Sequence, residues 1–207
     1  MSGYKPVFRV HLRNGNHLDL TGEHEVFVTR YKPGGRSYET KVRVQDLVPG
    51  DKVRPMLGDG AWRGCMDVDI DEAVILGMVQ GDGWMSGDSV YFHNREPEFL
   101  RHLEEWASHS GRVFDHLPDG RVAIRGMRSA LEKFGFHLHL RGDEWRTAIL
   151  PERGLPTSLM RQSPDVVRGF LRGLFSANGN ALAQHNRVCL KTTCRDMAVG
   201  VQHLLLA

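Results

Sequence analysis

Apolar and polar residues alternate along the first part of the chain, which is the pattern of half-buried strands. The runs Phe8–Leu12 and Leu18–Leu20 flank Asn14 and Gly15. An Asn-Gly pair suits a tight hairpin turn because both of its residues tolerate positive φ. This segment therefore predicts a small strand-rich unit that ends near residue 57. Its further strands are predicted at 26–28 and 42–44.

After a glycine-rich connection over 57–66, the apolar spacing changes to that of helices. Ser163, Pro164 and Asp165 have the side chains that favour a helix start: a capping hydroxyl, a proline at the first position and an acid at the positive end of the dipole. Asp71 is a candidate N-cap for an earlier helix. The predicted helices are 71–81, 97–108, 129–134, 163–177 and 197–206, and the predicted strands are 89–93, 112–116, 121–125 and 187–191.

Two of these helices carry matching sequences at an offset of 96 residues (178 − 82), and each is followed by a strand and another helix. In both copies, small residues lie four positions apart on one helical face. Small residues at this spacing let two helix backbones approach closely, as they do between membrane helices. We therefore expect the two helices to lie back to back and to bring their last residues together. The matched pairs are Gly77 with Gly173, Gly81 with Ala177 and Asp82 with Asn178.

Composition narrows this picture only a little. The 207 residues are 41% hydrophobic and carry a formal net charge of +2, which fits a soluble globular protein of one large or two small domains. No apolar run reaches the roughly eighteen residues of a spanning helix, and the start lacks a signal pattern. These features predict a cytoplasmic protein without a membrane partner. Cys65, Cys189 and Cys194 fit neither a disulfide framework nor a paired zinc motif.

The segment 75–83, with the sequence ILGMVQGDG, resembles the LAGLIDADG dodecapeptide of homing endonucleases. The segment 170–179, with the sequence FLRGLFSANG, resembles the second copy of that motif. The stretches 155–168 and 190–206 are similar to the flanks of the intein-borne members of the family. The resemblance covers residues 66–207 and implies an α+β, pseudo-twofold endonuclease domain of αββαββα repeats, the second of them truncated. It also implies a monomer that binds double-stranded DNA.

The segment 20–26 contains Thr21 and His24 and resembles the T-x-x-H block of inteins and related Hint domains. The stretch 44–53 is similar to the L-x-x-G-D-x-V sequence that follows this block. The resemblance implies that residues 1–60 are a partial Hint domain, whose partners in the parent chain are the host-protein exteins. It implies that His24 protonates the leaving nitrogen at the upstream splice junction and that Thr21 helps to hold that amide.

Both ends of a splicing reaction are missing from this sequence. Inteins begin with Cys or Ser, whereas this chain begins with Met1, Ser2 and Gly3. The pair His185 and Asn186 resembles a terminal block but lies inside the second repeat, so we interpret it as coincidence. We expect that the chain does not splice. We also expect marginal stability, because a truncated second repeat leaves a strand edge and apolar surface uncovered.

The resemblance assigns Asp82 and Asn178, which end the two dodecapeptides, to metal binding near the scissile phosphates. Oxygen ligands suit Mg²⁺, which activates water and neutralises charge during phosphodiester hydrolysis. Asn178 departs from the acid of the family, because an amide offers a carbonyl oxygen but no negative charge. We therefore expect weak cleavage, nicking of one strand, or DNA binding without cleavage.

Further residues follow from the same resemblance. Lys191 lies on the strand after the second dodecapeptide, where a lysine polarises the phosphate or the water in related enzymes, although it is equally compatible with a solvated strand lysine. The strands of both repeats are expected to form a saddle over the DNA major groove. The candidate phosphate or base contacts are Arg112, Arg121, Arg125 and Arg187, which the sequence does not rank.

Two other functions remain open. Asn178 favours a LAGLIDADG-derived binding protein, such as an RNA maturase or a transcription factor, that has lost cleavage. A Hint-type processing domain like that of hedgehog proteins would explain the T-x-x-H block, but such domains carry no dodecapeptides.

Overall fold

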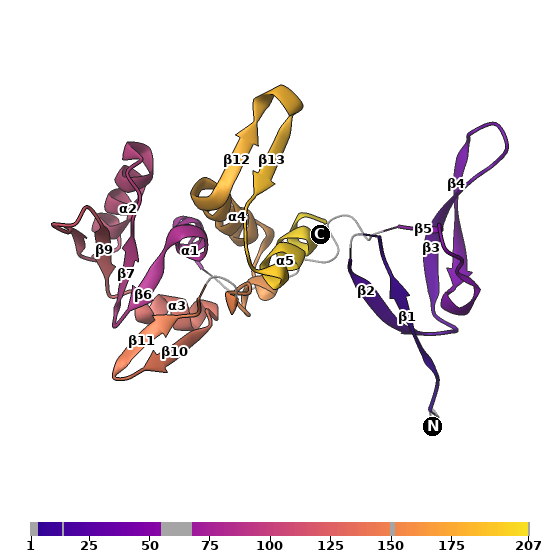
Figure 1. The fold of residues 1–207 in the computed structure, drawn as a ribbon, viewed down its shortest axis with the longest axis horizontal. Helices are drawn as coiled ribbons and strands as arrows, with labels where there is room; N and C mark the ends of the chain where they lie inside the picture. Colours follow the sequence, from indigo (N-terminus) through magenta and orange to yellow (C-terminus); the bar gives the residue numbers. More distant parts are fainter. Residues whose placement is uncertain (1–3, 14, 55–67, 150–151, 207) are drawn as a thin grey trace. The chain divides into compact units, whose positions relative to one another are not determined.

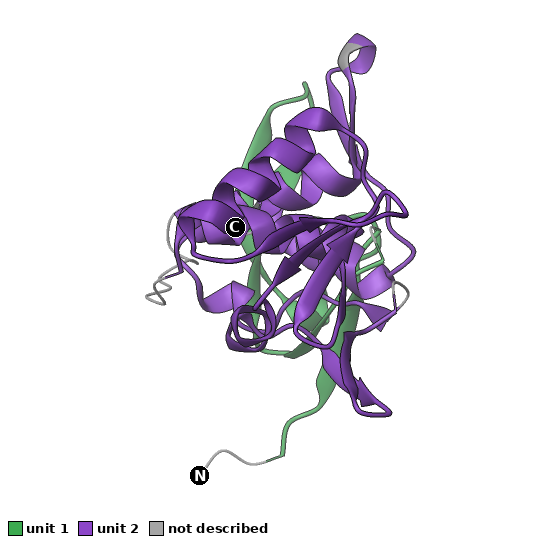
Figure 2. Cartoon of the chain, turned by 90° about the vertical axis from the view of Figure 1, so that its left-hand side faces the viewer, with its two compact units in different colours: residues 1–57 green, residues 58–207 purple. Residues whose placement is uncertain are grey.

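The computed structural model describes residues 4–13, 15–54, 68–149 and 152–206. The chain divides into two compact units, residues 1–57 and 58–207, which Figure 2 shows in different colours. The predicted connection over 57–66 and Cys65 lie outside the described residues. Among the described residues, no helix is long and apolar enough to cross a membrane.

The first unit is built from antiparallel strands, as the alternating pattern predicts. Strands β1 (Val7–His11) and β2 (His17–Thr21) form a hairpin in which Phe8 lies opposite Leu20. A second sheet has the order β4-β3-β5. The strand predicted at 42–44 is the end of a longer strand, and a 3-10 turn over Val44–Asp46 follows it. The strands of this sheet are β3 (Glu25–Tyr31), β4 (Ser37–Arg43) and β5 (Lys52–Val53).

The second unit mixes helices with antiparallel strands (Figure 1), which confirms the α+β class. All five predicted helices are present, within one or two residues of the expected bounds. The sequence did not predict strands β6, β10, β11 and β12, each of which has only three or four residues. The helices are α1 (Ile70–Asp82), α2 (Pro97–His109), α3 (Arg128–Phe134), α4 (Pro164–Asn178) and α5 (Arg195–Leu206). The strands are β6 (Trp84–Ser86), β7 (Ser89–Phe92), β8 (Phe114–His116), β9 (Val122–Arg125), β10 (Leu138–Arg141), β11 (Glu144–Thr147), β12 (Gly179–Leu182) and β13 (Arg187–Leu190).

The starts of the two matching helices are capped by side-chain oxygens. The hydroxyl of Ser163 accepts a hydrogen bond from the backbone N–H of Val166, and Pro164 opens α4, as predicted. At α1 the predicted cap was two residues late: the carboxylate of Asp69 accepts from the N–H groups of Asp71 and Glu72. Asp71 instead lies in the first turn, where its charge is favoured by the helix dipole.

Helices α1 and α4 pack against each other through their glycines. A side chain at Gly77 would overlap the carbonyl oxygen of Phe170, and one at Gly173 would overlap that of Val74. Helix α1 is buried continuously from Ala73 to Gly81, so it forms the centre of the hydrophobic core. The back-to-back arrangement predicted from the repeat is therefore confirmed.

The largest sheet has the order β10-β11-β6-β7-β9-β8, and one of its faces covers this core. Side chains on that face are buried together with those of α1, α2 and α3. The apolar residues of α2 are spaced so that one side of this helix faces the same core. Its buried side chains include Phe99, Leu103 and Trp106. The buried strand residues are Met85, Val90, Phe92, Val122 and Ile124.

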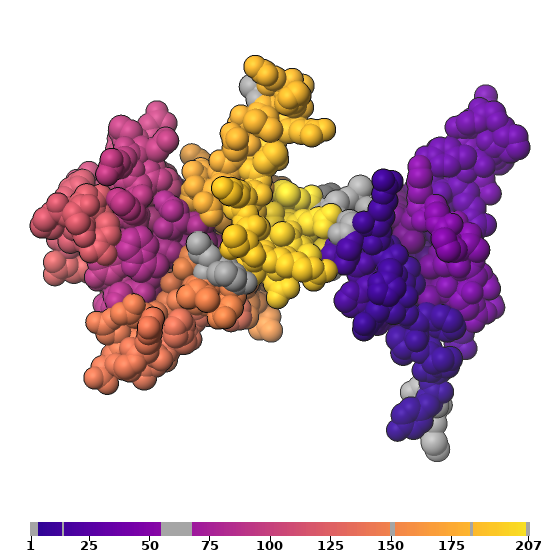
Figure 3. Space-filling view, in the orientation of Figure 1, coloured from indigo at the N-terminus to yellow at the C-terminus, as the bar shows by residue number. Residues whose placement is uncertain are grey.

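Strands β12 and β13 form a separate hairpin, which stands out from the rest of the second unit (Figures 1 and 3). Within the described part of the chain, β13 pairs only with β12, so its other edge is open. Val188 on β13 and Leu205 on α5 are 67% and 62% exposed. The open edge and exposed apolar surface expected for the second repeat are both present.

The glycine contacts lead to a stability prediction. We expect Gly77→Ala to lower the free energy of unfolding by about 1–3 kcal/mol, because the new methyl group meets backbone atoms that cannot move aside. Gly200→Ala is the matched control, since it also adds a methyl to a helix interior but meets only the flexible side chain of Leu155. Urea unfolding of both variants measures the difference. A Gly77→Ala protein as stable as Gly200→Ala would contradict the packing described here.

Candidate active site and nucleic-acid interface

The last residues of α1 and α4 meet at one point. The side-chain Nδ2 of Asn178 donates a hydrogen bond of 2.7 Å to the backbone carbonyl of Gly81, and Gly81 packs against Ala177. Asp82, the residue after Gly81, is the last residue of α1. The two positions that the repeat matches are thus brought together, as predicted.

Asp82 is in an environment that disfavours its negative charge. Burial raises the pKa of its carboxyl group, and this exceeds the opposing effects of a hydrogen bond from Asn94 and of the charge of His93. The hydrogen bond from Asn94 is long, at 3.5 Å between Nδ2 and Oδ2. The carbonyl groups at the end of α1 also repel an acid at this position. A cation bound at Asp82 would relieve each of these costs.

The oxygen atoms at the two helix ends fit a hard divalent cation. Asp82 supplies a carboxylate, and Asn178 keeps its side-chain carbonyl as an acceptor because its amide group is the donor to Gly81. No group of three His, Cys, Asp or Glu side chains among the described residues is arranged to hold a metal. Mg²⁺ binds with few protein ligands, since it keeps several waters and takes substrate phosphate oxygens. The residues present therefore fit Mg²⁺ shared with a phosphate.

A buried arginine, which the sequence did not predict, donates hydrogen bonds to the carbonyl groups at the end of α1. Arg153 is 5% exposed and donates to the carbonyls of Val79 and Gly83, the latter at 2.6 Å. Burial lowers the pKa of this side chain to about 10, so it remains charged at neutral pH. Next to it, the fully buried Gln80 donates to the carbonyls of Arg153 and Gly154. Neither residue belongs to a periodic pattern, so the sequence contained no signal for this contact.

The other face of the six-stranded sheet is polar, and its side chains lie in rows across the strands. Register places Arg146 opposite Ser86, Ser86 opposite Ser89, and Ser89 opposite Arg125. Residues paired in this way point to the same side of a sheet. His139 on β10 extends the row, because it lies opposite Arg146.

A second row on this face begins two residues after Asp82. Trp84 stacks against Tyr91, with ring centroids 5.9 Å apart, and Tyr91 lies opposite Ala123. The guanidinium of Arg121 lies 5.6 Å from the centre of the Tyr91 ring. Because β-strand side chains alternate between faces, Arg121, Ala123 and Arg125 share this side of the sheet. An aromatic pair and arginines therefore lie on the same face, next to the end of α1.

The structure assigns different places to the four candidate arginines, which the sequence did not rank. Arg121 and Arg125 lie on the polar sheet face. Arg112 does not, because it stacks on Trp106 of α2 and forms an ion pair of 3.5 Å with Glu72 of α1. Arg187 opens the exposed hairpin strand β13.

Lys191 lies beside the second helix end through its backbone. Its N–H donates to the carbonyl of Asn178 at 3.2 Å, and its side chain is exposed. With β7 and β13 aligned (Val188 on Val90), the residue in the first repeat at the place of Lys191 is His93. His93 was not singled out from the sequence, because helix and strand alignments of the two repeats differ by two residues.

Thr21 and His24 lie in the first unit, in a turn where the N–H of His24 donates to the carbonyl of Thr21 at 3.0 Å. The side chain of His24 is exposed. The backbone of this turn is held against the turn at 44–46 by hydrogen bonds from Val44 to His24 and from Gln45 to Gly22. The two residues are near each other, and their role in splicing stays a prediction.

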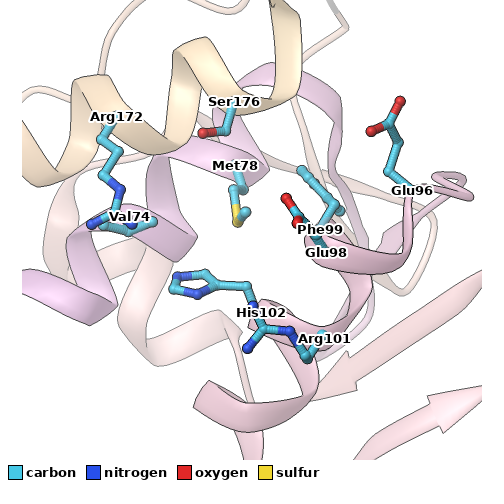
Figure 4. Close-up of a pocket in the computed structure, with 9 residues that line it drawn as sticks. All are labelled: Val74, Met78, Glu96, Glu98, Phe99, Arg101, His102, Arg172 and Ser176. Atoms are coloured by element: carbon cyan, nitrogen blue, oxygen red, sulfur yellow. The ribbon is translucent and has the colours of Figure 1, made fainter.

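A cavity of about 310 Å³ lies between α1, α2 and α4 (Figure 4). It contains neither Asp82 nor Asn178. Its lining carries both charge signs, from the acids Glu96 and Glu98 and from Arg101 and Arg172. The cavity is therefore separate from the meeting point of the helix ends.

A comparison with known families matches residues 165–207 to the family described as "LAGLIDADG-like domain". The matched segment contains α4, the β12–β13 hairpin and α5. The chain thus carries a LAGLIDADG-like domain in its second repeat, which points to a homing endonuclease or a DNA-binding relative. The match does not extend to residues 1–60, so the intein and Hint interpretation has no support from it.

The raised pKa of Asp82 predicts how its removal affects stability. A carboxyl group whose pKa is raised by folding destabilises the native state once it ionises, so the penalty appears as pH rises through the folded pKa. We expect Asp82→Asn to raise the free energy of unfolding at pH 7.5, and this gain to shrink at pH 4. Urea unfolding at both pH values measures the effect. The exposed Asp143→Asn is the control, and an equal gain in both variants would contradict the prediction.

Proposed function

We propose that this protein binds duplex DNA and, with Mg²⁺, hydrolyses one of the two strands at a single phosphodiester. The observation that carries this proposal is the meeting of two unequal helix ends, one acidic at Asp82 and one neutral at Asn178. A LAGLIDADG-like domain at residues 165–207 supports a nucleic-acid substrate.

The reaction is an in-line attack of water on the phosphorus atom. A divalent cation at Asp82 would supply activation of that water and neutralisation of the leaving oxygen. The carboxylate of Asp82 would hold this cation at the end of α1, where Arg153 donates a hydrogen bond to the carbonyl of Gly83. The amide of Asn178 keeps the two helix ends together but adds no negative charge. The first half of the site is therefore the more competent for hydrolysis.

In this proposal, Lys191 and His93 would contact the phosphate at the two halves of the site. Each follows the strand that leads away from a helix end, β13 for Lys191 and β7 for His93. An ammonium group favours the negative charge that develops on phosphate oxygens in the transition state. The backbone N–H of Lys191 bonds to the carbonyl of Asn178, so the ammonium group of Lys191 would stabilise the bound strand on the side where the carboxylate is missing.

The polar sheet face suits the DNA groove. With strands about 4.8 Å apart, the row from His139 to Arg125 spans roughly 19 Å, so across a major groove about 12 Å wide its ends would reach the phosphates on both sides. The face presents hydrogen-bonding groups and an aromatic pair rather than a continuous cationic surface. It therefore suits contacts with base edges in addition to phosphates.

A second candidate function is DNA or RNA binding without cleavage, as in a maturase or a transcription factor. Asn178 favours it, because the loss of one carboxylate removes a metal ligand but leaves the sheet face unchanged. Both functions require the same interface and differ only in the chemistry at Asp82.

For the first unit we propose a remnant of a protein-splicing domain, with Thr21 and His24 at its former junction site. The support is the T-x-x-H turn and the strand-rich fold of residues 4–54. The parent protein would then be a monomeric, cytoplasmic intein flanked by host-protein sequence. The coding sequence on both sides of these residues tests this directly, because an intein is flanked by host-protein sequence.

Cleavage is tested on a supercoiled plasmid that carries a target selected from a random duplex pool by binding to the protein. We expect the wild type with Mg²⁺ to produce nicked circles. Asp82→Asn should reduce the rate at least about 100-fold, since a metal ion contributes several kcal/mol of charge stabilisation. Asn178→Asp should produce linear plasmid, because it restores a carboxylate to the second half.

Agarose gel electrophoresis separates the three plasmid forms. Asp143→Asn, an exposed acid at the β10–β11 turn, is the control for surface charge. Efficient linearisation by the wild type would contradict single-strand nicking. Binding without any nicking, in both the wild type and Asn178→Asp, would favour the second candidate function.

A further inference from the structure

Three arginines that the structure places on the sheet face beside Asp82 are each held by a neighbouring acid. The Nε atom of Arg121 donates to Asp119 at 2.7 Å, and that of Arg125 donates to Asp115 at 2.7 Å. Arg146 donates through Nη2 to Glu144 at 2.8 Å. We call these three the paired arginines.

Strand register places two of the acids, Asp115 and Glu144, on the same side of the sheet as their arginines, and Asp119 lies in the turn between β8 and β9. Asp115 lies opposite Ala123, which is two residues from Arg125 on β9. Glu144 is two residues before Arg146 on β11, and the hydroxyl of Ser86 on the neighbouring strand also donates to it, at 2.9 Å. Asp119 is two residues before Arg121 and accepts the backbone N–H of Arg121 as well. The pairs are therefore part of the sheet architecture.

Arg121 is the most restrained of the three. Its guanidinium lies 5.9 Å from the ring of Trp84 and 5.6 Å from that of Tyr91 while Asp119 holds its Nε. Its side chain is 38% exposed, compared with 64% for Arg125. The ion pair lowers the pKa of Asp119, so this acid is charged at neutral pH.

The pairing has opposite consequences for two kinds of DNA contact. Non-specific affinity comes from cations that neutralise phosphates, and a carboxylate beside each arginine opposes that attraction. Base reading depends on a guanidinium fork fixed in position, since an arginine meets O6 and N7 of guanine with two parallel hydrogen bonds. A guanidinium has five N–H donors, so one bound to a carboxylate still has donors for a base.

We propose that Asp115, Asp119 and Glu144 are specificity-determining residues, which hold the paired arginines as readers of guanine edges and prevent them from acting as free phosphate contacts. This inference rests on the proposed function, that this face binds duplex DNA. It assigns recognition to three acids that never touch the DNA themselves.

Binding is measured without metal, in EDTA, so that the result does not depend on cleavage. Fluorescence anisotropy compares a duplex selected from a random pool with a scrambled duplex of the same composition, between 50 and 300 mM KCl. The variants are Asp115→Asn, Asp119→Asn, Glu144→Gln and their combination. The matched control is Asp165→Asn, which frees Arg168 from an equivalent pair on helix α4.

In the combined variant we expect binding of the scrambled duplex to tighten and to become more salt-dependent, by up to about 0.9 in the log–log slope for each arginine that gains a phosphate. Discrimination between the two duplexes should fall by at least about tenfold, which is the contribution of one bidentate base contact. A new selection with Arg121→Gln should lose a guanine from the preferred sequence. Asp165→Asn should change neither discrimination nor the selected sequence.

Two results would overturn the inference while leaving DNA binding intact. One is a combined variant that discriminates as well as the wild type. The other is an equal gain of affinity for the selected and scrambled duplexes. That result would mean that the acids only lower the positive charge of the sheet face. A wild type that binds neither duplex would overturn the proposed function as well. Circular dichroism of each variant confirms that the sheet is folded before binding is compared.

Discussion

The close contact of α1 and α4 is the constraint on which the rest of the second unit depends. Gly77 and Gly173 face backbone carbonyls of the opposite helix, so neither position accepts even a methyl group. Because the helices run side by side to their ends, Asp82 and Asn178 arrive at one place. Strands β6 and β12 start directly after those ends, so the same contact also fixes where each hairpin begins. Packing thus determines both the candidate site and the position of the polar sheet face.

Placing an acid at this point works against the stability of the fold. Carbonyl groups at the end of a helix carry partial negative charge, and Asp82 adds a half-buried carboxylate to them. Arg153 offsets part of this, because its buried guanidinium donates to the carbonyls of Val79 and Gly83. An ion pair would have neutralised Asp82 more completely, but it would also have occupied the oxygens that a cation needs. The arginine therefore acts on the helix end and leaves the carboxylate accessible.

The sequence predicted the features that have a period or a repeat. The five helices, the contact of α1 with α4 and the meeting of residues 82 and 178 follow from apolar spacing and small residues. Strands β10 and β11 were missed although the sequence of β10 alternates apolar and polar residues, and the cap of α1 was misplaced because Asp69 and Asp71 both fit it. Arg153, Arg146 and the acids that hold Arg121 and Arg125 were missed for another reason: these contacts are set by tertiary packing and strand register, which no local pattern contains.

The two halves of the site show why the residues at the helix ends change more easily than the glycines that hold the two helices together. The glycines cannot be replaced without separating the helices, whereas Asn178, at the position where the resemblance implies an acid, donates a hydrogen bond of 2.7 Å to the carbonyl of Gly81. Exchanging a half-buried carboxylate for an amide removes a desolvation cost and strengthens the contact between the helix ends. Stability therefore favours an amide over a carboxylate at position 178, and the contacts of the polar sheet face do not depend on which of the two is present. Under the proposed function, a protein of this architecture is expected to lose cleavage of one strand before it loses either its fold or its ability to recognise DNA.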